Sequence, residues 1–70
     1  MNHHSVKSSR IASIAYDEKA SILEIDFYQT GKVQYRGVPA RIFRDFLSVV
    51  SKGRFYDGVI KGKYVEIKKK

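Results

Sequence analysis

The sequence contains no cysteine. This absence excludes disulfide bonds, thiolate metal sites and a cysteine nucleophile. Small secreted domains commonly depend on disulfides, so a cysteine-free chain of 70 residues favours a reducing compartment, and we expect a cytoplasmic protein. No apolar run approaches the roughly 20 residues that span a membrane, and we recognise no signal peptide, so we expect no membrane partner.

The motifs that accompany common cofactors are also missing. Neither GxGxxG nor GxxxxGK[ST] occurs, and Gly31-Lys32 stands alone as a turn signal. His3 and His4 are adjacent but have no third ligand nearby, so they predict no metal site. Glu24 and Asp26 share one face of a predicted strand, where two carboxylates could act as an acid/base pair, but we interpret them as a solvent-facing sheet edge or as partners for nearby lysines. We therefore expect a protein that is not an enzyme and needs no cofactor.

Acidic residues are scarce where basic residues accumulate. The chain has 14 lysines and arginines against 7 acidic residues, a formal net charge of +7. Residues 1–30 contain three basic and four acidic residues, whereas residues 31–70 contain eleven and three. A basic excess on one part of a chain attracts polyanions, and nucleic acid is the first candidate.

Proline occurs once, and its position separates two kinds of periodicity. Before it, three segments alternate apolar and polar side chains and predict strands joined by turns: residues 10–16, 21–28 and 33–38. From Pro39 onward, apolar residues recur at helical spacing, which predicts a helix over residues 39–50. Residues 64–68 predict a last strand with Val65 and Ile67 facing the core.

The predicted fold class is α+β, a small antiparallel sheet of order β-β-β-α-β with one helix packed on one face. Residues 54–63 fit either a hairpin at Asp57-Gly58 or a short helical turn before the last strand, and we favour the helical turn. The predicted boundaries are a flexible N-terminus over 1–9, a single domain over 10–68 and a basic tail over 69–70. One apolar cluster is predicted as the core: Leu23, Ile25, Phe27, Tyr35, Phe43, Phe46 and Ile67.

Several short motifs resemble those of one known family. They are Ser8-Ser9-x-Ile11, Leu23-x-Ile25-x-Phe27, Gly31-Lys32-Val33-Gln34-Tyr35-Arg36-Gly37-Val38-Pro39, Ser51-Lys52-Gly53-Arg54-Phe55 and, after Ile60, Lys61-Gly62-Lys63-Tyr64. Over about residues 6–68 the chain resembles the KTSC domain, a small module of bacterial and phage proteins that also ends some lysyl-tRNA synthetases. The resemblance implies no established activity, although RNA binding has been proposed for the family. The family's central Tyr-x-Tyr motif is Val33-Gln34-Tyr35 here, so only Tyr35 carries over.

Nucleic-acid binding requires cations for phosphates and exposed aromatic rings for bases. Strand alternation places Tyr28 and Tyr64 on the face opposite the apolar side chains, together with Arg36 and Lys68. RNA-recognition sheets stack bases on such a free face. A second group of basic residues follows the predicted helix, with glycines between its members: Lys52, Arg54, Lys61 and Lys63.

These residues support two hypotheses of different classes. The first is a module that binds RNA or single-stranded nucleic acid by neutralising phosphates and stacking bases on tyrosines. The alternative is a protein-interaction module that uses the free sheet face as a homodimer or partner interface. Tyrosine and arginine are favoured at such interfaces, and a small domain without disulfides gains stability from association.

Overall fold

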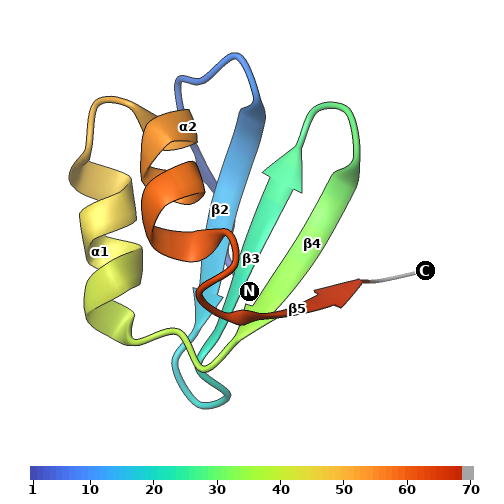
Figure 1. The fold of residues 1–70 in the computed structure, drawn as a ribbon, viewed down its shortest axis with the longest axis vertical. Helices are drawn as coiled ribbons and strands as arrows, with labels where there is room; N and C mark the ends of the chain where they lie inside the picture. The colour runs from blue at the N-terminus through green and yellow to red at the C-terminus, as the bar shows by residue number, and fades with distance from the viewer. Residues whose placement is uncertain (69–70) are drawn as a thin grey trace.

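The computed structural model describes residues 1–68 as a five-stranded antiparallel sheet with helices on one side (Figure 1). The strands are β1 (His4–Ser5), β2 (Ile11–Asp17), β3 (Ile22–Phe27), β4 (Gly31–Arg36) and β5 (Val65–Lys68). The helices are α1 (Ala40–Ser48), α2 (Lys52–Phe55) and the π-helix η1 (Tyr56–Ile60). The predicted α+β class and the three central strands are confirmed.

The order of strands in the sheet follows their order in the chain, β1-β2-β3-β4-β5. Leu23 lies opposite Tyr35, and Ile25 lies opposite Val33, so the apolar positions of β3 and β4 share one face. Gly31 begins β4 with a φ of 78°, a left-handed conformation that glycine adopts at little cost. The tight turn between β3 and β4 follows from this residue.

Helix α1 begins at Ala40, directly after Pro39, whose extended backbone (φ −65°, ψ 149°) precedes the first turn. The helix ends at Ser48, two residues before the predicted end, because Val49 is extended with a ψ of 150°. Lys52 Nζ then donates hydrogen bonds to the carbonyl oxygens of Leu47 and Val49. A cation at the last carbonyls of a helix stabilises its C-terminal end.

The segment whose structure the sequence left open is helical. α2 runs directly into η1, and the backbone N–H of Lys61 donates to the Tyr56 carbonyl oxygen at 2.8 Å. The preference for a helical turn over a hairpin is therefore confirmed, although the helical run is longer than predicted and begins at Lys52. Tyr56 and Ile60 are its buried side chains, and they anchor the run on the sheet.

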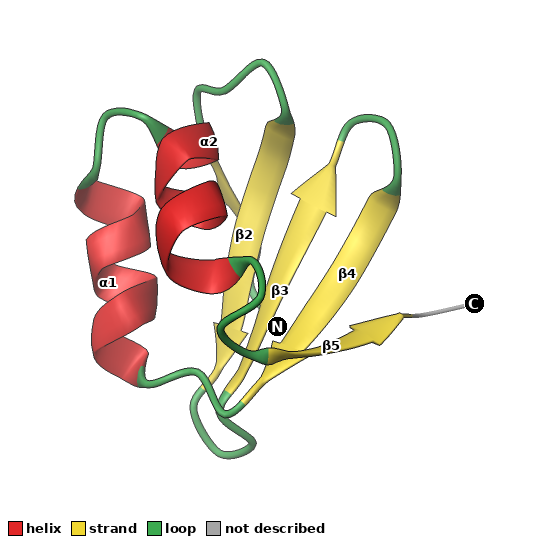
Figure 2. Cartoon of the chain, in the orientation of Figure 1, coloured by secondary structure: helices red, strands yellow, loops and turns green. Residues whose placement is uncertain are grey.

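Helices α1 and α2 lie nearer to β2 than to β4 and β5 (Figure 2), while η1 reaches β4, where the Tyr56 ring lies edge-on to Tyr35. Phe46 is fully buried and stacks on Phe55, with ring centroids 5.0 Å apart. Of the predicted core residues, four are buried: Leu23, Ile25, Tyr35 and Phe46. Phe27 and Phe43 are partly buried and pack against this core.

The predicted orientation of β5 is wrong. Glu66 pairs with Tyr35, so Glu66 lies on the helix side of the sheet, and Val65 and Ile67 lie on the opposite face. Ile67 is therefore not a member of the predicted core, and Val65 is 61% exposed. A polar contact accompanies this orientation: the Tyr35 hydroxyl donates a hydrogen bond to Glu66, so the carboxylate has a partner on the helix side.

The N-terminal residues also adopt structure within the range that we predicted to be flexible. His4 pairs with Ile14 and Ser5 with Ser13, which adds a short edge strand beside β2. The His4 ring lies 5.7 Å from the Phe43 ring. The predicted basic tail, residues 69–70, lies outside the described residues.

Candidate functional site

Two adjoining hollows open on the helix side of the molecule. The first, which we call the large hollow, has a volume of about 600 Å³ and lies between η1, β4, β5 and the turn after β3. The second, the small hollow, has a volume of about 340 Å³ and lies between residues 7–10 and the start of α2. Ser9 and Arg10 line both hollows and so mark the boundary between them.

Two tyrosines and a glutamate line the large hollow. The hydroxyl oxygens of Tyr35 and Tyr56 are 2.5 Å apart, and the Tyr35 hydroxyl donates to Glu66 Oε1 at 3.1 Å. Since Tyr35 has one hydroxyl proton, Tyr56 must be the donor in the contact between the tyrosines. Burial, followed by the bond to Tyr56, raises the pKa of Tyr35 well above its ordinary value. The arrangement is a directed chain of hydrogen bonds ending on a carboxylate.

An exposed ring and a cation belong to the rim of the large hollow. Tyr28 follows β3 and is 64% exposed, while its backbone N–H donates to the Arg10 carbonyl oxygen at 3.1 Å. Lys61 follows η1 and is also exposed. Phe27 lies beneath, edge-on to Tyr56 with ring centroids 5.0 Å apart. The backbone of Tyr28 is thus fixed while its ring is available to a ligand.

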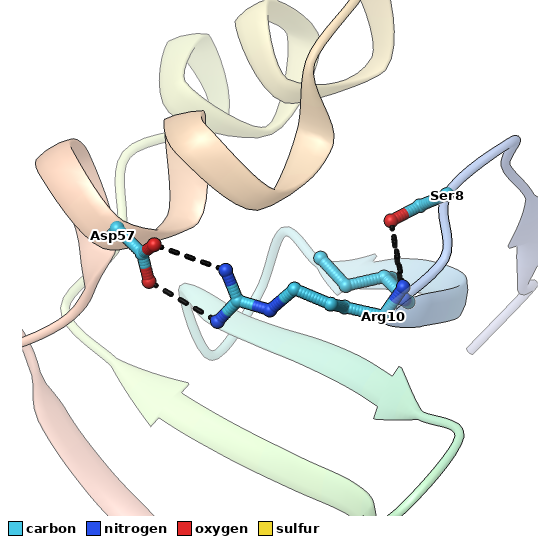
Figure 3. A network of polar contacts seen from close by, with 4 residues as sticks. Ser8, Arg10 and Asp57 are labelled. Atoms are coloured by element: carbon cyan, nitrogen blue, oxygen red, sulfur yellow. Dashed lines mark hydrogen bonds and ion pairs between the residues drawn. The ribbon is translucent and has the colours of Figure 1, made fainter.

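Arg10 joins the start of β2 to η1 (Figure 3). Its Nη1 donates to Asp57 Oδ2 at 2.9 Å and its Nη2 to Asp57 Oδ1 at 3.2 Å, a bidentate pair. The pair holds the pKa of Asp57 below its ordinary value and raises that of Arg10. A Cβ added at Gly53 would lie 3.2 Å from Arg10 Nη1, so the glycine leaves room for the guanidinium. The Ser8 hydroxyl accepts from the Arg10 backbone N–H at 3.2 Å and orders the approach to β2.

The predicted binding residues divide among several places. Tyr28 and Lys61 line the large hollow, and Lys52 and Arg54 line the small one. Arg36 lies on the open sheet face as predicted, and exposed Lys63 follows η1. Lys68 ends β5 opposite Val33, so this position belongs to the helix side and its predicted place on the open face is wrong. The bonds from Lys52 Nζ to the end of α1 give this lysine a structural role in addition.

The predicted placement of both tyrosines on the open sheet face is wrong. Tyr64 precedes β5, is partly buried and packs against the core. Tyr28 lies beyond the end of β3 and lines the hollow on the helix side. Strand alternation stops applying where a strand ends, and the register of a strand decides which of its two sets of side chains faces the core. The exposure predicted for Tyr28 is confirmed.

The open sheet face carries a polar network that the sequence did not predict. His3 Nε2 lies 2.5 Å from Glu24 Oε1, and His3 Nδ1 lies 2.8 Å from Ser13 Oγ. Gln34 Nε2 donates to Glu24 Oε2 at 2.8 Å. Glu24 is consequently buried, with 6% exposed, so its interpretation as a solvent-facing residue is wrong. Among the described strand residues on this face there is no tyrosine or phenylalanine.

The sequence did not predict three residues that line the small hollow: Ser8, Arg10 and Asp57. Arg10 and Asp57 are 47 residues apart, and only the docking of η1 near the start of β2 brings them together. The motif Ser8-Ser9-x-Ile11 was a visible signal for this region, but it carried no statement about chemistry.

Residues 1–68 contain neither a membrane-spanning helix nor a cluster of metal ligands. No helix in this range is long and apolar enough to cross a membrane. The described histidines, aspartates and glutamates form no group of three that could hold a metal ion.

The KTSC domain family model matches residues 7–64, most of the chain. The crystal structure of a KTSC domain protein from Yersinia pestis is similar, with a TM-score of 0.95 and 52% identity over 99% of this chain and 97% of that one. A protein of Tsukamurella paurometabola is 36% identical over 59 residues, covering 84% of this chain and 88% of its own length. A protein of Stutzerimonas stutzeri is 31% identical over 61 residues, with coverages of 87% and 86%. The chain therefore belongs to the KTSC domain family.

Proposed function

We propose that the protein binds single-stranded nucleic acid, RNA or DNA, along the two hollows on its helix side. The observation that carries this proposal is the adjacency of the hollows, which share Arg10 and combine cations with the exposed ring of Tyr28. The basic residues that line them come from three separate segments: Lys7, Arg10, Lys52, Arg54 and Lys61.

Each of the two interactions follows from a simple property of the ligand. Backbone phosphates attract lysine and arginine, and the release of counterions makes such binding dependent on salt. Every base has a π-face, so a ring such as Tyr28 can stack on any base. We therefore expect weak sequence preference, an affinity near micromolar and a strong dependence on salt concentration.

The helix side supports this function better than the open face. Arg36 on the open face has no aromatic neighbour among the described strand residues of that face. Tyr28 on the helix side lines the same hollow as Lys61. A ligand that needs both stacking and charge therefore finds both along the hollows.

The test is a titration of a fluorescent ten-nucleotide oligouridylate with the full chain at several salt concentrations. The slope of log affinity against log salt should reach about 0.7 for each phosphate contacted. Tyr28→Ala should weaken binding by about 1–3 kcal/mol with an unchanged salt slope, because stacking is lost but phosphate contacts remain. Tyr28→Phe is the matched control and should retain the affinity.

Absence of binding at about 100 μM protein in low salt would contradict the proposal, since even non-specific binding falls within that range. A second candidate function is then protein–protein contact through the open sheet face. The outward-facing Val65, 61% exposed, favours it. Under this alternative the chain should run as a dimer in size-exclusion chromatography with light scattering.

A further inference from the structure

The Arg10–Asp57 ion pair has the bidentate geometry with which arginine also binds phosphate groups. Two N–H groups of one guanidinium meet two oxygens of one acid, at 2.9 and 3.2 Å (Figure 3). The arginine fork binds carboxylates and phosphates in this same bidentate manner. Asp57 therefore occupies the position on Arg10 that an incoming phosphate oxygen pair would take.

The surroundings of this pair favour an anion. Asp57 is the one acidic residue among the described residues that line the small hollow, and four basic residues line it. Ser8, Ser9 and Ser51 also line it and add hydroxyl groups, which donate hydrogen bonds to phosphate oxygens. The hollow of about 340 Å³ thus has a positive charge excess, and its single carboxylate is held against Arg10.

The pair is also easy to separate. The Arg10 side chain is 48% exposed and the Asp57 side chain 49% exposed. Surface ion pairs contribute little to stability, because water solvates both partners after separation. The Arg10 guanidinium has a second contact, 5.9 Å from the Tyr56 ring centroid, which does not depend on Asp57.

We propose that Asp57 competes with phosphate for Arg10, and that a phosphate group enters the small hollow by displacing the Asp57 carboxylate. The inference rests on the proposed function for its source of phosphate, the nucleic-acid backbone, but the site itself recognises any phosphate group. Removing the carboxylate therefore increases affinity, beyond the general effect of making the protein more positive.

The experiment compares the wild-type chain with Asp57→Asn and Asp45→Asn. Asp45 is exposed on α1, so its substitution changes the net charge equally without altering Arg10. Inorganic phosphate is titrated first, with the Arg10 side-chain N–H resonance followed by NMR. Asp57→Asn should bind phosphate about three- to tenfold more tightly than wild type, because the charge-assisted bidentate contact becomes available. Asp45→Asn should gain less than about twofold, as expected for a screened distant charge.

Equal gains for the two variants would overturn the inference, as would a loss of affinity in a folded Asp57→Asn protein. Arg10→Lys in the Asp57→Asn background tests whether the gain in phosphate affinity depends on the guanidinium group. It keeps the charge but removes the fork, so it should abolish the gain, and a retained gain would also overturn the inference.

The ten-nucleotide oligouridylate is titrated next. Its failure to bind the wild type would contradict the proposed function, while the phosphate titration would still decide the role of Asp57. If both hold, Asp57→Asn should also tighten oligouridylate binding more than Asp45→Asn does.

Discussion

The two faces of the sheet differ in how their polar side chains are used. On the helix side, Tyr35 and Glu66 belong to a hydrogen-bonded chain that lines the large hollow together with Arg10 and Lys61. On the open side, His3, Glu24 and Gln34 bond to one another. Three polar side chains of the open face thus bond to one another, whereas the helix side presents an exposed ring and several cations along its hollows. Function is therefore best sought where the helices leave the sheet partly uncovered.

The largest difference between the faces should be in stability. Phe46→Ala removes a fully buried ring from the helix side and should lower the free energy of unfolding by about 3–5 kcal/mol. Val65→Ala on the open face, where the side chain is 61% exposed, should change it by less than about 0.5 kcal/mol. Urea denaturation followed by circular dichroism measures both. Similar losses would show that the core is not concentrated under the helices.

The hydroxyl chain provides the next largest effect. Tyr35→Phe removes the hydrogen bonds to Tyr56 and Glu66 and should lower the free energy of unfolding by about 1–3 kcal/mol near neutral pH. The raised pKa of Tyr35 means that the folded chain holds this proton more tightly than the unfolded chain. Its stabilisation is complete below the unfolded-state pKa of about 10 and is lost as the pH rises above it.

Thermal melts between neutral pH and about pH 11 measure this dependence. Tyr35→Phe should flatten the alkaline fall in stability, because the substituted ring cannot titrate. Tyr28→Phe, at an exposed ring, should leave the fall unchanged. Parallel curves for wild type and Tyr35→Phe would contradict the assigned role of the buried hydroxyl.

The smallest expected effect is on the affinity for the oligouridylate, when one charge is removed from either face. Lys61→Gln at the large hollow should weaken oligouridylate binding about threefold and lower the salt slope by about 0.7. Arg36→Gln removes one charge from the open face and should change the slope little. Fluorescence anisotropy at several salt concentrations resolves the two. A larger slope change for Arg36→Gln would move the interface to the open face.

The parts of the fold that the sequence predicted are those with strong local signals. Leu23, Ile25 and Phe27 alternate with Glu24 and Asp26, and this period predicted both the strand and its buried face. The one proline marked the start of α1 for an equally local reason, its fixed φ.

The parts that could not be predicted depend on distant partners. Val65 and Ile67 are more apolar than Glu66, so alternation alone assigned the wrong face to β5. In the structure Glu66 faces the helix side and accepts a hydrogen bond from Tyr35, which is 31 residues away. Arg10 and Asp57 likewise meet across 47 residues, so the small hollow has no continuous sequence signature. The candidate site was therefore only partly visible, in Tyr28, Lys61 and the basic residues near α2.

The strand order β1-β2-β3-β4-β5 has a consequence for folding kinetics. Adjacent strands from β2 to β4 are joined by short turns, and closing a short loop costs little entropy. The segment between β4 and β5 contains α1, α2 and η1, so pairing these two strands closes a much longer loop. This pairing therefore has the largest loop-closure entropy cost in the sheet. We expect β5 to join last. Glu66 arrives with it, so the hydrogen-bonded chain of the large hollow is completed only in the final step of folding.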